Sequence, residues 1–333
     1  MKQSILAAWT ALAITFAMAF GAAEMDARHA AAMAQITPPA AGSEALEILV
    51  TAAPAARPAP QVIKLKDGDD TVETELEDYI LCVLAAEMPA DFEPEALKAQ
   101  AVAARSYALY CAAADKHGDS AVCTDYGCCQ AYKSEDAMRS QWGADYERLR
   151  RKLQSAVDST AGQYLMYAGE PVFAAFHSSS AGYTESSGAI WSELPYLVSV
   201  LSPESAENVP NYQSSLELSP LDFRDTLLHA CPEADFSGEE SGWIGEASYE
   251  DSGRVESLLL GGVMYSGTKL RELFSLRSTA FTLEYTGESF LFTVTGFGHG
   301  VGMSQYGANL MAAEGSDYAA ILAHYYPGTV LVG

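Results

Sequence analysis

Apolar side chains recur at helical spacing in three segments of the first half of the chain, residues 77–86, 94–110 and 144–160. In the first segment one face is formed by Tyr79, Ile80, Val83 and Leu84. The second segment is rich in alanine and has a proline in its first turn, which is typical of the start of a helix. We therefore predict a helix for each of the three segments.

Strand-like patterns dominate the chain after residue 163. Strands are predicted at 163–168, 171–176, 255–260, 281–285 and 290–295, and helices at 268–273, 304–314 and 318–324. A hairpin is also predicted at 61–66 and 71–75, around a turn at 67–70. Early helices and later strands predict an α+β fold, in which a helical N-terminal part packs on a mainly antiparallel, strand-rich remainder with a substrate cleft between them.

The N-terminus has a different pattern. One lysine precedes an uncharged run from Ser4 to Ala23, which predicts a signal or signal-anchor helix over residues 1–23. Residues 24–60 are rich in alanine and proline and are interpreted as a linker, so the folded body is expected at 61–333. The length of the apolar run favours a retained single-pass anchor over a cleaved, secreted form. In both cases the body works outside the cytoplasm.

The 333-residue chain has a formal net charge of −25. This charge argues against nucleic acid or an anionic membrane surface as a partner. The acidic residues are spread along the chain among aromatic ones, so the charge is better explained by solubility than by a disordered acidic tail.

One carboxylate stands out. Glu87 ends an apolar run that is stopped by Pro89, where burial can raise its pKa and make it a general acid. The alternative is a structural glutamate that pairs with Arg105 across two packed helices. Lys98 and Arg105 are seven residues apart and share a helix face. Cations facing Glu87 would lower its pKa, which conflicts with an acid role.

Four potential metal ligands crowd into a short segment: His117, Cys123, Cys128 and Cys129. One imidazole and three thiolates suit tetrahedral zinc, but the spacing is not that of a zinc finger. The alternative is a disulfide between Cys123 and either Cys128 or Cys129, which an exported chain would favour. The residue types leave the two alternatives open. A metal with four protein ligands would be structural, because it has no open position for catalysis.

Two further segments carry polar side chains. Residues 176–185 contain His177 and three serines after a predicted strand, consistent with a cleft edge that binds a polar substrate or with an ordinary turn. A serine hydrolase using one of these serines with His177 or His299 as base is the weaker alternative, since no nucleophile-elbow motif is present. Residues 296–307 form a glycine-rich turn that is not a dinucleotide fingerprint. Its structural alternative is a tight turn around a packed His299.

These segments together resemble the stage II sporulation protein D family, including its amidase-enhancer relatives. The resemblance covers the body and is carried by LAAEMP at 84–89, ALKAQAVAARSY at 96–107, CQAY at 129–132, TAGQ at 160–163, FHSSSAG at 176–182 and GHGVGMSQYGA at 298–308. Several separate motifs in the same order make this resemblance highly specific.

The resemblance implies a lytic transglycosylase that acts on peptidoglycan glycan strands without stem peptides. It cleaves the bond between N-acetylmuramic acid and N-acetylglucosamine and leaves an anhydro-muramic end. Glu87 matches the family's catalytic glutamate. A single acid/base can perform this reaction, whereas ordinary glycosidases need two carboxylates.

The resemblance also implies a structural zinc site in some members, bound by two histidines and two cysteines. His117, Cys123 and Cys129 match three of these ligands, while Cys128 stands where histidine is usual. Implied partners are a cell-wall amidase and a membrane protein of sporulation engulfment. Residues expected to line the substrate cleft are Lys98, Arg105, Tyr107, His177, Ser178, His299, Gln305 and Tyr306. A non-catalytic, glycan-binding activator of a wall amidase is the alternative function.

Overall fold

The computed structural model describes residues 61–333. The predicted signal or anchor helix and the predicted linker lie outside the described residues. Within 61–333, no helix is both long enough and apolar enough to cross a membrane.

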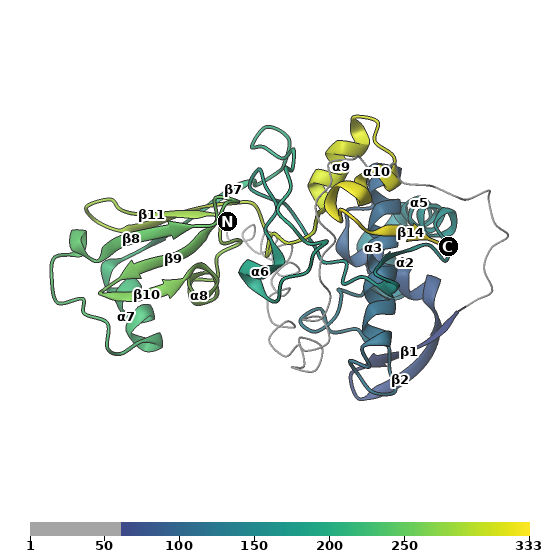
Figure 1. Cartoon of the computed structure of the whole chain (residues 1–333), viewed down its shortest axis with the longest axis horizontal. Helices are drawn as coiled ribbons and strands as arrows, with labels where there is room; N and C mark the ends of the chain where they lie inside the picture. The colour runs from purple at the N-terminus through teal and green to yellow at the C-terminus, as the bar shows by residue number, and fades with distance from the viewer. Residues whose placement is uncertain (1–60) are drawn as a thin grey trace, which may run out of the picture.

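Helices and strands alternate along the described chain (Figure 1). The helices are α2 (Leu76–Glu87), α3 (Pro94–Ala113), α4 (Glu135–Trp142), α5 (Tyr146–Ser159), α6 (Ser187–Ile190), α7 (Pro220–Ala230), α8 (Gly267–Leu273), α9 (Gln305–Ala313) and α10 (Tyr318–Tyr325). The strands are β1 (Val62–Asp67), β2 (Asp70–Glu75), β3 (Val122–Cys123), β4 (Tyr164–Tyr167), β5 (Glu170–Pro171), β6 (Phe176–His177), β7 (Gln213–Leu218), β8 (Ile244–Tyr249), β9 (Val255–Leu260), β10 (Val263–Ser266), β11 (Phe281–Tyr285), β12 (Phe290–Thr295), β13 (Met303–Ser304) and β14 (Val330–Val332).

The first hydrophobic core is built around α3. This helix starts with Pro94 at its first turn and is buried along most of its length. The helices α2 and α5 pack on it, and α9 and α10 return from the C-terminus to pack on it as well. The helix α2 ends at Glu87, and the next residue, Met88, is extended. This end is explained by Pro89, because a proline disfavours helical backbone at the residue before it.

Small sheets border this core. The hairpin of β1 and β2 is extended by parallel β3, β4 pairs with β14 and β5, and β6 pairs in parallel with β13. The β6–β13 pair joins the serine-rich segment to the end of the glycine-rich turn. Two motifs that are more than 100 residues apart in sequence therefore lie side by side.

The part of the chain that runs from β7 to β12 forms a second, separate core. Two three-stranded antiparallel sheets, in the orders β11-β12-β7 and β10-β9-β8, enclose it together with α7 and α8. Stacked aromatic rings fill its centre, with Phe223 and Phe290 at 4.0 Å between ring centroids and Trp243 stacked on Phe290 at 5.5 Å. Figure 1 shows this part as a lobe at one end of the molecule, with α6 between it and the helical lobe.

The predicted α+β class is confirmed. The strands predicted at 255–260, 281–285 and 290–295 coincide with β9, β11 and β12. The prediction of a strand at 171–176 was wrong for most of its length, because 172–175 run as irregular chain between β5 and β6. Much of the strand-rich part builds its own core, and the helices that follow it complete the core of the N-terminal helices.

The glycine-rich turn makes a close contact between the two lobes. Gly300 has φ +88, and a Cβ there would lie 2.5 Å from Cζ of Arg254. We expect Gly300→Ala to lower the free energy of unfolding by about 1–3 kcal/mol for backbone strain and by about 1–3 kcal/mol more for the overlap. Gly287→Ala is the matched control, since Gly287 has φ +97 and open space around it. If urea unfolding gives both variants the same loss in the free energy of unfolding, the close contact between Gly300 and Arg254 makes no contribution to stability.

Candidate active site and metal cluster

Glu87 is the last residue of α2 and is half-buried. Its Oε1 accepts a hydrogen bond of 2.7 Å from the backbone N–H of Ala131. Burial raises the pKa of Glu87 to about 7, although the Ala131 N–H, the Gln305 amide and the Lys133 ammonium each lower it. The carboxyl group is therefore close to half-protonated at neutral pH, which suits a general acid that also acts as a base.

Two polar side chains accompany Glu87. Lys133 donates to the carbonyl oxygen of Ala85 at 2.7 Å, so its ammonium is anchored at the end of α2. Gln305 is the first residue of α9 and is buried. Its Nε2 forms no hydrogen bond of normal geometry with any group in the described part of the chain. Its side chain is nevertheless close enough to the Glu87 carboxyl to lower the pKa of that group.

The cations predicted to face Glu87 lie elsewhere. Arg105 is fully buried and binds Glu77 in a bidentate ion pair, with Nε to Oε1 at 3.0 Å and Nη2 to Oε2 at 2.5 Å. Lys98 pairs with Glu95 at 2.6 Å. Neither cation is among the groups that shift the pKa of Glu87. The predicted conflict between an acid role and a cationic helix face is therefore absent.

The other predicted substrate residues fall into two groups. Tyr107 is buried beside the cysteine-rich loop, where its hydroxyl contacts the Cys128 carbonyl oxygen at 3.4 Å. In the second group, Ser178 accepts through its backbone oxygen from the N–H of Tyr306 at 3.0 Å. Tyr306 follows Gln305, so this second group lies next to the Glu87 carboxyl.

His177 and His299 are buried, and their rings lie 5.7 Å apart. His177 Nε2 is 2.8 Å from the hydroxyl of Ser180, and its Nδ1 is 3.2 Å from the carbonyl oxygen of Val301. Burial lowers the pKa of His299 to about 3, so this ring is neutral. Ser180 is fully buried, and within residues 61–333 the ring nitrogens of His177 bind Val301 and Ser180 and no carboxylate, which argues against a serine hydrolase that uses Ser180.

A line of aromatic rings was not predicted. Phe173 and Trp191 are half-buried and contact edge to face at 5.6 Å, and Trp191 contacts His299 at 5.0 Å. The only sequence signal was a single tryptophan in a segment without periodicity. Partly exposed rings of this kind are suited to stacking against the apolar face of a sugar.

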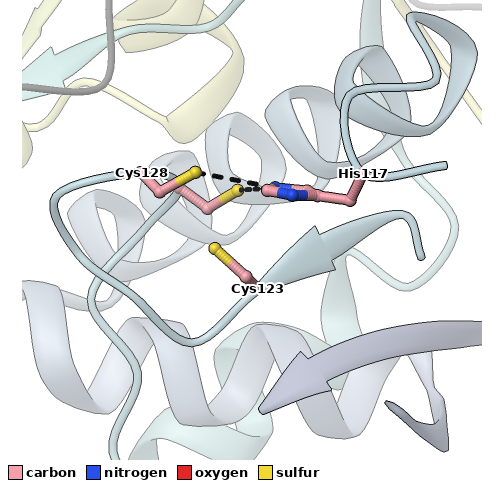
Figure 2. Close-up of side chains that lie close together, drawn as sticks. His117, Cys123 and Cys128 are labelled. Atoms are coloured by element: carbon pink, nitrogen blue, oxygen red, sulfur yellow. Dashed lines mark hydrogen bonds between the residues drawn. The ribbon is translucent and has the colours of Figure 1, made fainter. Parts of the chain in front are cut away.

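The four predicted metal ligands are brought together. Their ligand atoms all lie within 4.8 Å of one another. His117 Nε2 is 3.1 Å from the sulfur of Cys129 and 3.7 Å from that of Cys128, and Figure 2 shows Cys123 approaching from β3. Ligands at about 2.1–2.3 Å from a tetrahedral zinc ion are roughly 3.5–3.8 Å apart, so the cluster fits such an ion.

All six cysteines lie within residues 61–333, and none of them forms a disulfide. A hydrogen bond that the Cys129 thiol donates to Cys111, together with burial, raises the pKa of Cys129 to about 12, while Cys123 counteracts this. Cys111, in α3, is a neighbour that the sequence analysis missed. Protonated, crowded thiols need a cation to become ligands, and a divalent metal would supply it.

The chain was compared with known proteins. A family model described as Stage II sporulation protein matches residues 66–167. Stage II sporulation protein D of Bacillus subtilis (strain 168) is 36% identical over 297 residues, covering 88% of this chain and 82% of that protein. The protein of the same name from Bacillus amyloliquefaciens is 38% identical over 258 residues, covering 76% and 73%. The chain belongs to the stage II sporulation protein D family.

A more distant relative is named amidase enhancer. This Bacillus subtilis protein is 29% identical over 298 residues, which cover 75% of this chain and 39% of that protein. Together the relatives support a role in the cell wall during sporulation. The family model spans Glu87 and all four members of the cysteine–histidine cluster.

The metal cluster gives a direct prediction. We expect the purified protein to hold about one zinc ion per chain by elemental mass spectrometry, because the four ligand atoms fit a tetrahedral ion. Cys129→Ser should lose the ion and lower the thermal midpoint, since zinc binding adds to folding free energy. Cys128→His should keep it, because imidazole ligates zinc equally well.

Cys231→Ser is the matched control, because Cys231 lies in the second lobe outside the cluster. A protein that carries no zinc when expressed with zinc in the medium, or a Cys129→Ser variant with unchanged zinc content, would contradict the assignment.

Proposed function

We propose that this protein is a peptidoglycan lytic transglycosylase that cleaves denuded glycan strands between N-acetylmuramic acid and N-acetylglucosamine. The observation that carries the proposal is Glu87, a half-buried carboxyl with a pKa of about 7. No other carboxylate is among the groups that shift this pKa. Ordinary glycosidases use a second carboxylate beside the acid, so an acid whose pKa no other carboxylate shifts favours a reaction without hydrolytic water.

In the proposed mechanism, protonated Glu87 donates its proton to the glycosidic oxygen as the bond to the anomeric carbon of the muramic residue breaks. The ionised carboxylate then accepts the proton of the hydroxymethyl group of that residue, whose oxygen attacks the anomeric carbon. The product is an anhydro-muramic end, and the acid is regenerated without consuming water. The Gln305 amide, which lies beside the carboxyl group, would donate to that group or to a substrate oxygen.

The metal cluster has a separate role in this proposal. His117, Cys123, Cys128 and Cys129 would hold a structural zinc ion, which would tie the loop to β3. The loop continues to Ala131, whose N–H binds Glu87 at 2.7 Å. The metal would thus stiffen the segment that positions the acid, and it would take no part in proton transfer.

The setting follows from the family and the predicted N-terminal segment. We infer that the body works outside the cytoplasm, on an anchor or after secretion, in septal wall remodelling during engulfment. A wall amidase that removes stem peptides would supply its substrate, and a membrane protein of engulfment would be a partner. The second candidate function, a non-catalytic activator of such an amidase, is favoured by the relative named amidase enhancer.

Product analysis separates these functions. Denuded glycan strands are incubated with the wild type and with Glu87→Gln, and the products are identified by mass spectrometry. Anhydro-muramic products from the wild type alone are expected. Reducing-end products would indicate hydrolysis and a second carboxylate. Binding without products from either protein would favour the activator.

A further inference from the structure

Glu204 is a buried carboxylate that none of the sequence motifs includes and that the proposed mechanism does not use. It lies in the chain between β6 and β7 and is 5% exposed. Its Oε1 accepts two hydrogen bonds, one of 2.8 Å from the backbone N–H of Ser180 and one from the hydroxyl of Ser304. The two donors belong to the serine-rich segment and to the glycine-rich turn, so a single carboxylate joins these motifs.

The contact with Ser304 fixes the start of α9. Ser304 is the N-cap of this helix, and its Oγ accepts from the backbone N–H of Gly307 at 3.2 Å. Because the same hydroxyl donates its hydrogen to Glu204, its lone pairs are free to face the helix. A Cβ at Gly307 would lie 3.1 Å from Oε2 of Glu204 and would overlap the hydroxyl oxygen of Tyr325. The close approach of α9 to the carboxylate therefore depends on this glycine.

The start of α9 lies against the chain that follows α2. The rings of Tyr306 and Phe92 contact edge to face at 5.0 Å between centroids. Gln305, the first residue of α9, is near enough for its amide to lower the pKa of Glu87. The position of this helix end therefore determines where the Gln305 amide lies relative to the proposed acid.

Arg254 brings a counter-charge to Glu204. It directly precedes β9 and is 1% exposed. Burial lowers the pKa of Arg254, and the carboxylates of Glu185 and Glu204 oppose this. Oε2 of Glu204 forms no hydrogen bond within residues 61–333, so the nearby guanidinium helps to compensate its charge. The support of α9 therefore extends from Ser304 through Glu204 to the second lobe.

We propose that Glu204 is a positioning residue for the active site, because it holds the N-cap of α9 and thereby the Gln305 amide beside the Glu87 carboxyl. Glu204 acts through the helix, since it is not itself among the groups that shift the pKa of Glu87. The inference rests on the proposed function in taking Glu87 to be the general acid. It adds that the hydrogen bonding of the acid depends on a carboxylate in a different segment of the chain.

The test measures the pKa of Glu87 by carbon-13 NMR titration of the side-chain carboxyls, with the signal identified by its loss in Glu87→Gln. We expect Glu204→Ala to raise the titration midpoint by about 0.4–1 pH unit, the equivalent of one hydrogen bond, because a displaced Gln305 no longer favours the ionised form. Loss of the negative charge at Glu204 would by itself lower the midpoint, so the direction of the change is diagnostic. Glu204→Gln should leave the midpoint nearly unchanged, because its amide oxygen can accept both hydrogen bonds.

Two further variants make the result independent of one substitution. Ser304→Ala removes the same link from the side of the helix and should also raise the titration midpoint of Glu87. Glu217→Ala is the matched control, because this exposed glutamate of β7 also accepts from a serine hydroxyl, that of Ser289 at 2.5 Å. It should leave the midpoint unchanged.

Gln305→Ala separates positioning from a general loss of structure. It should raise the midpoint of Glu87 by itself, and adding Glu204→Ala should then produce no further rise. The proposal is overturned if Glu204→Ala and Ser304→Ala lower the thermal midpoint of unfolding but keep the wild-type pKa at Glu87. A further rise in the double variant would overturn it as well.

Failure of this inference and failure of the proposed function are distinguishable, because the titration needs no cleavage. A raised pKa of Glu87 in the variants, together with no anhydro-muramic products from the wild type, would support the positioning role of Glu204 and remove the transglycosylase. Anhydro-muramic products together with an unchanged pKa would do the reverse.

Discussion

Glu87→Gln is expected to lower the rate of glycan-strand cleavage by about 10²–10⁴-fold, the contribution of one general acid/base group. Glutamine keeps the size of the side chain and can still accept the Ala131 N–H through its carbonyl oxygen, but it has no proton to donate. Initial rates on denuded strands give the measurement. Glycan affinity should be nearly unchanged, and a parallel loss of affinity would indicate a binding role for Glu87 instead.

The pH dependence provides an independent signature. The pKa of Glu87 is about 7 and the reaction starts from the protonated form, so the rate should fall about tenfold per pH unit well above pH 7. Lys133→Met removes a cation that lowers this pKa. The alkaline limb should therefore move to higher pH in that variant. If the alkaline limb of the pH–rate profile does not move in Lys133→Met, a group other than Glu87 controls this limb.

The same shift affects stability. The pKa of Glu87 is raised in the folded state, so the folded protein binds more protons than the unfolded chain between pH 4.5 and about 7. The wild type therefore loses stability as the pH rises through this window, by up to about 3 kcal/mol at 1.36 kcal/mol per pKa unit. Glu87→Gln lacks this loss. Relative to Glu87→Gln, the wild type should therefore lose unfolding free energy from pH 4.5 to about 7, and the difference between the two proteins should stay constant above pH 7.

Periodicity predicted the helices and strands well where one face of an element is buried. The helix over 144–160 and the strands of 281–285 and 290–295 are of this kind, and their buried faces follow from apolar spacing. The strand predicted at 171–176 failed because the chain at 172–175 is irregular and its central residue, Phe173, packs against the rings of Tyr107 and Trp191. Local pattern does not distinguish these two forms of burial.

The candidate site was predictable to the extent that motifs report it. Glu87 and the four candidate metal ligands were predicted from residue type and spacing, and the structure brings the four candidate ligands together. The role of Arg105 was not predictable, because its partner Glu77 lies 28 residues earlier and is attached through tertiary packing. The separate core of the second lobe also depends on long-range contacts that no single segment encodes.

The ion pair of Arg105 and Glu77 leads to the largest expected loss of stability. Arg105 is fully buried and also donates to the Gln163 carbonyl oxygen at 2.8 Å, while Glu77 accepts from the N–H of Gly162 at 3.0 Å. The pair therefore ties α2 and α3 to the chain that enters β4. Glu77→Gln leaves a buried guanidinium without its counter-charge, and we expect a loss of about 3–5 kcal/mol in the free energy of unfolding.

Urea unfolding measures this loss, and two variants sharpen its interpretation. Glu272→Gln removes a partner from the exposed Lys269–Glu272 pair and should cost less than about 1 kcal/mol. Replacing both members of the buried pair, Glu77→Leu with Arg105→Met, should recover much of the stability, because no uncompensated charge remains. If Glu77→Gln instead keeps its stability but binds glycan more weakly, Arg105 acts on the substrate, as its motif suggested. That result would contradict a stabilising role for the ion pair, and it would make the surface of α3 near Arg105 part of the substrate site.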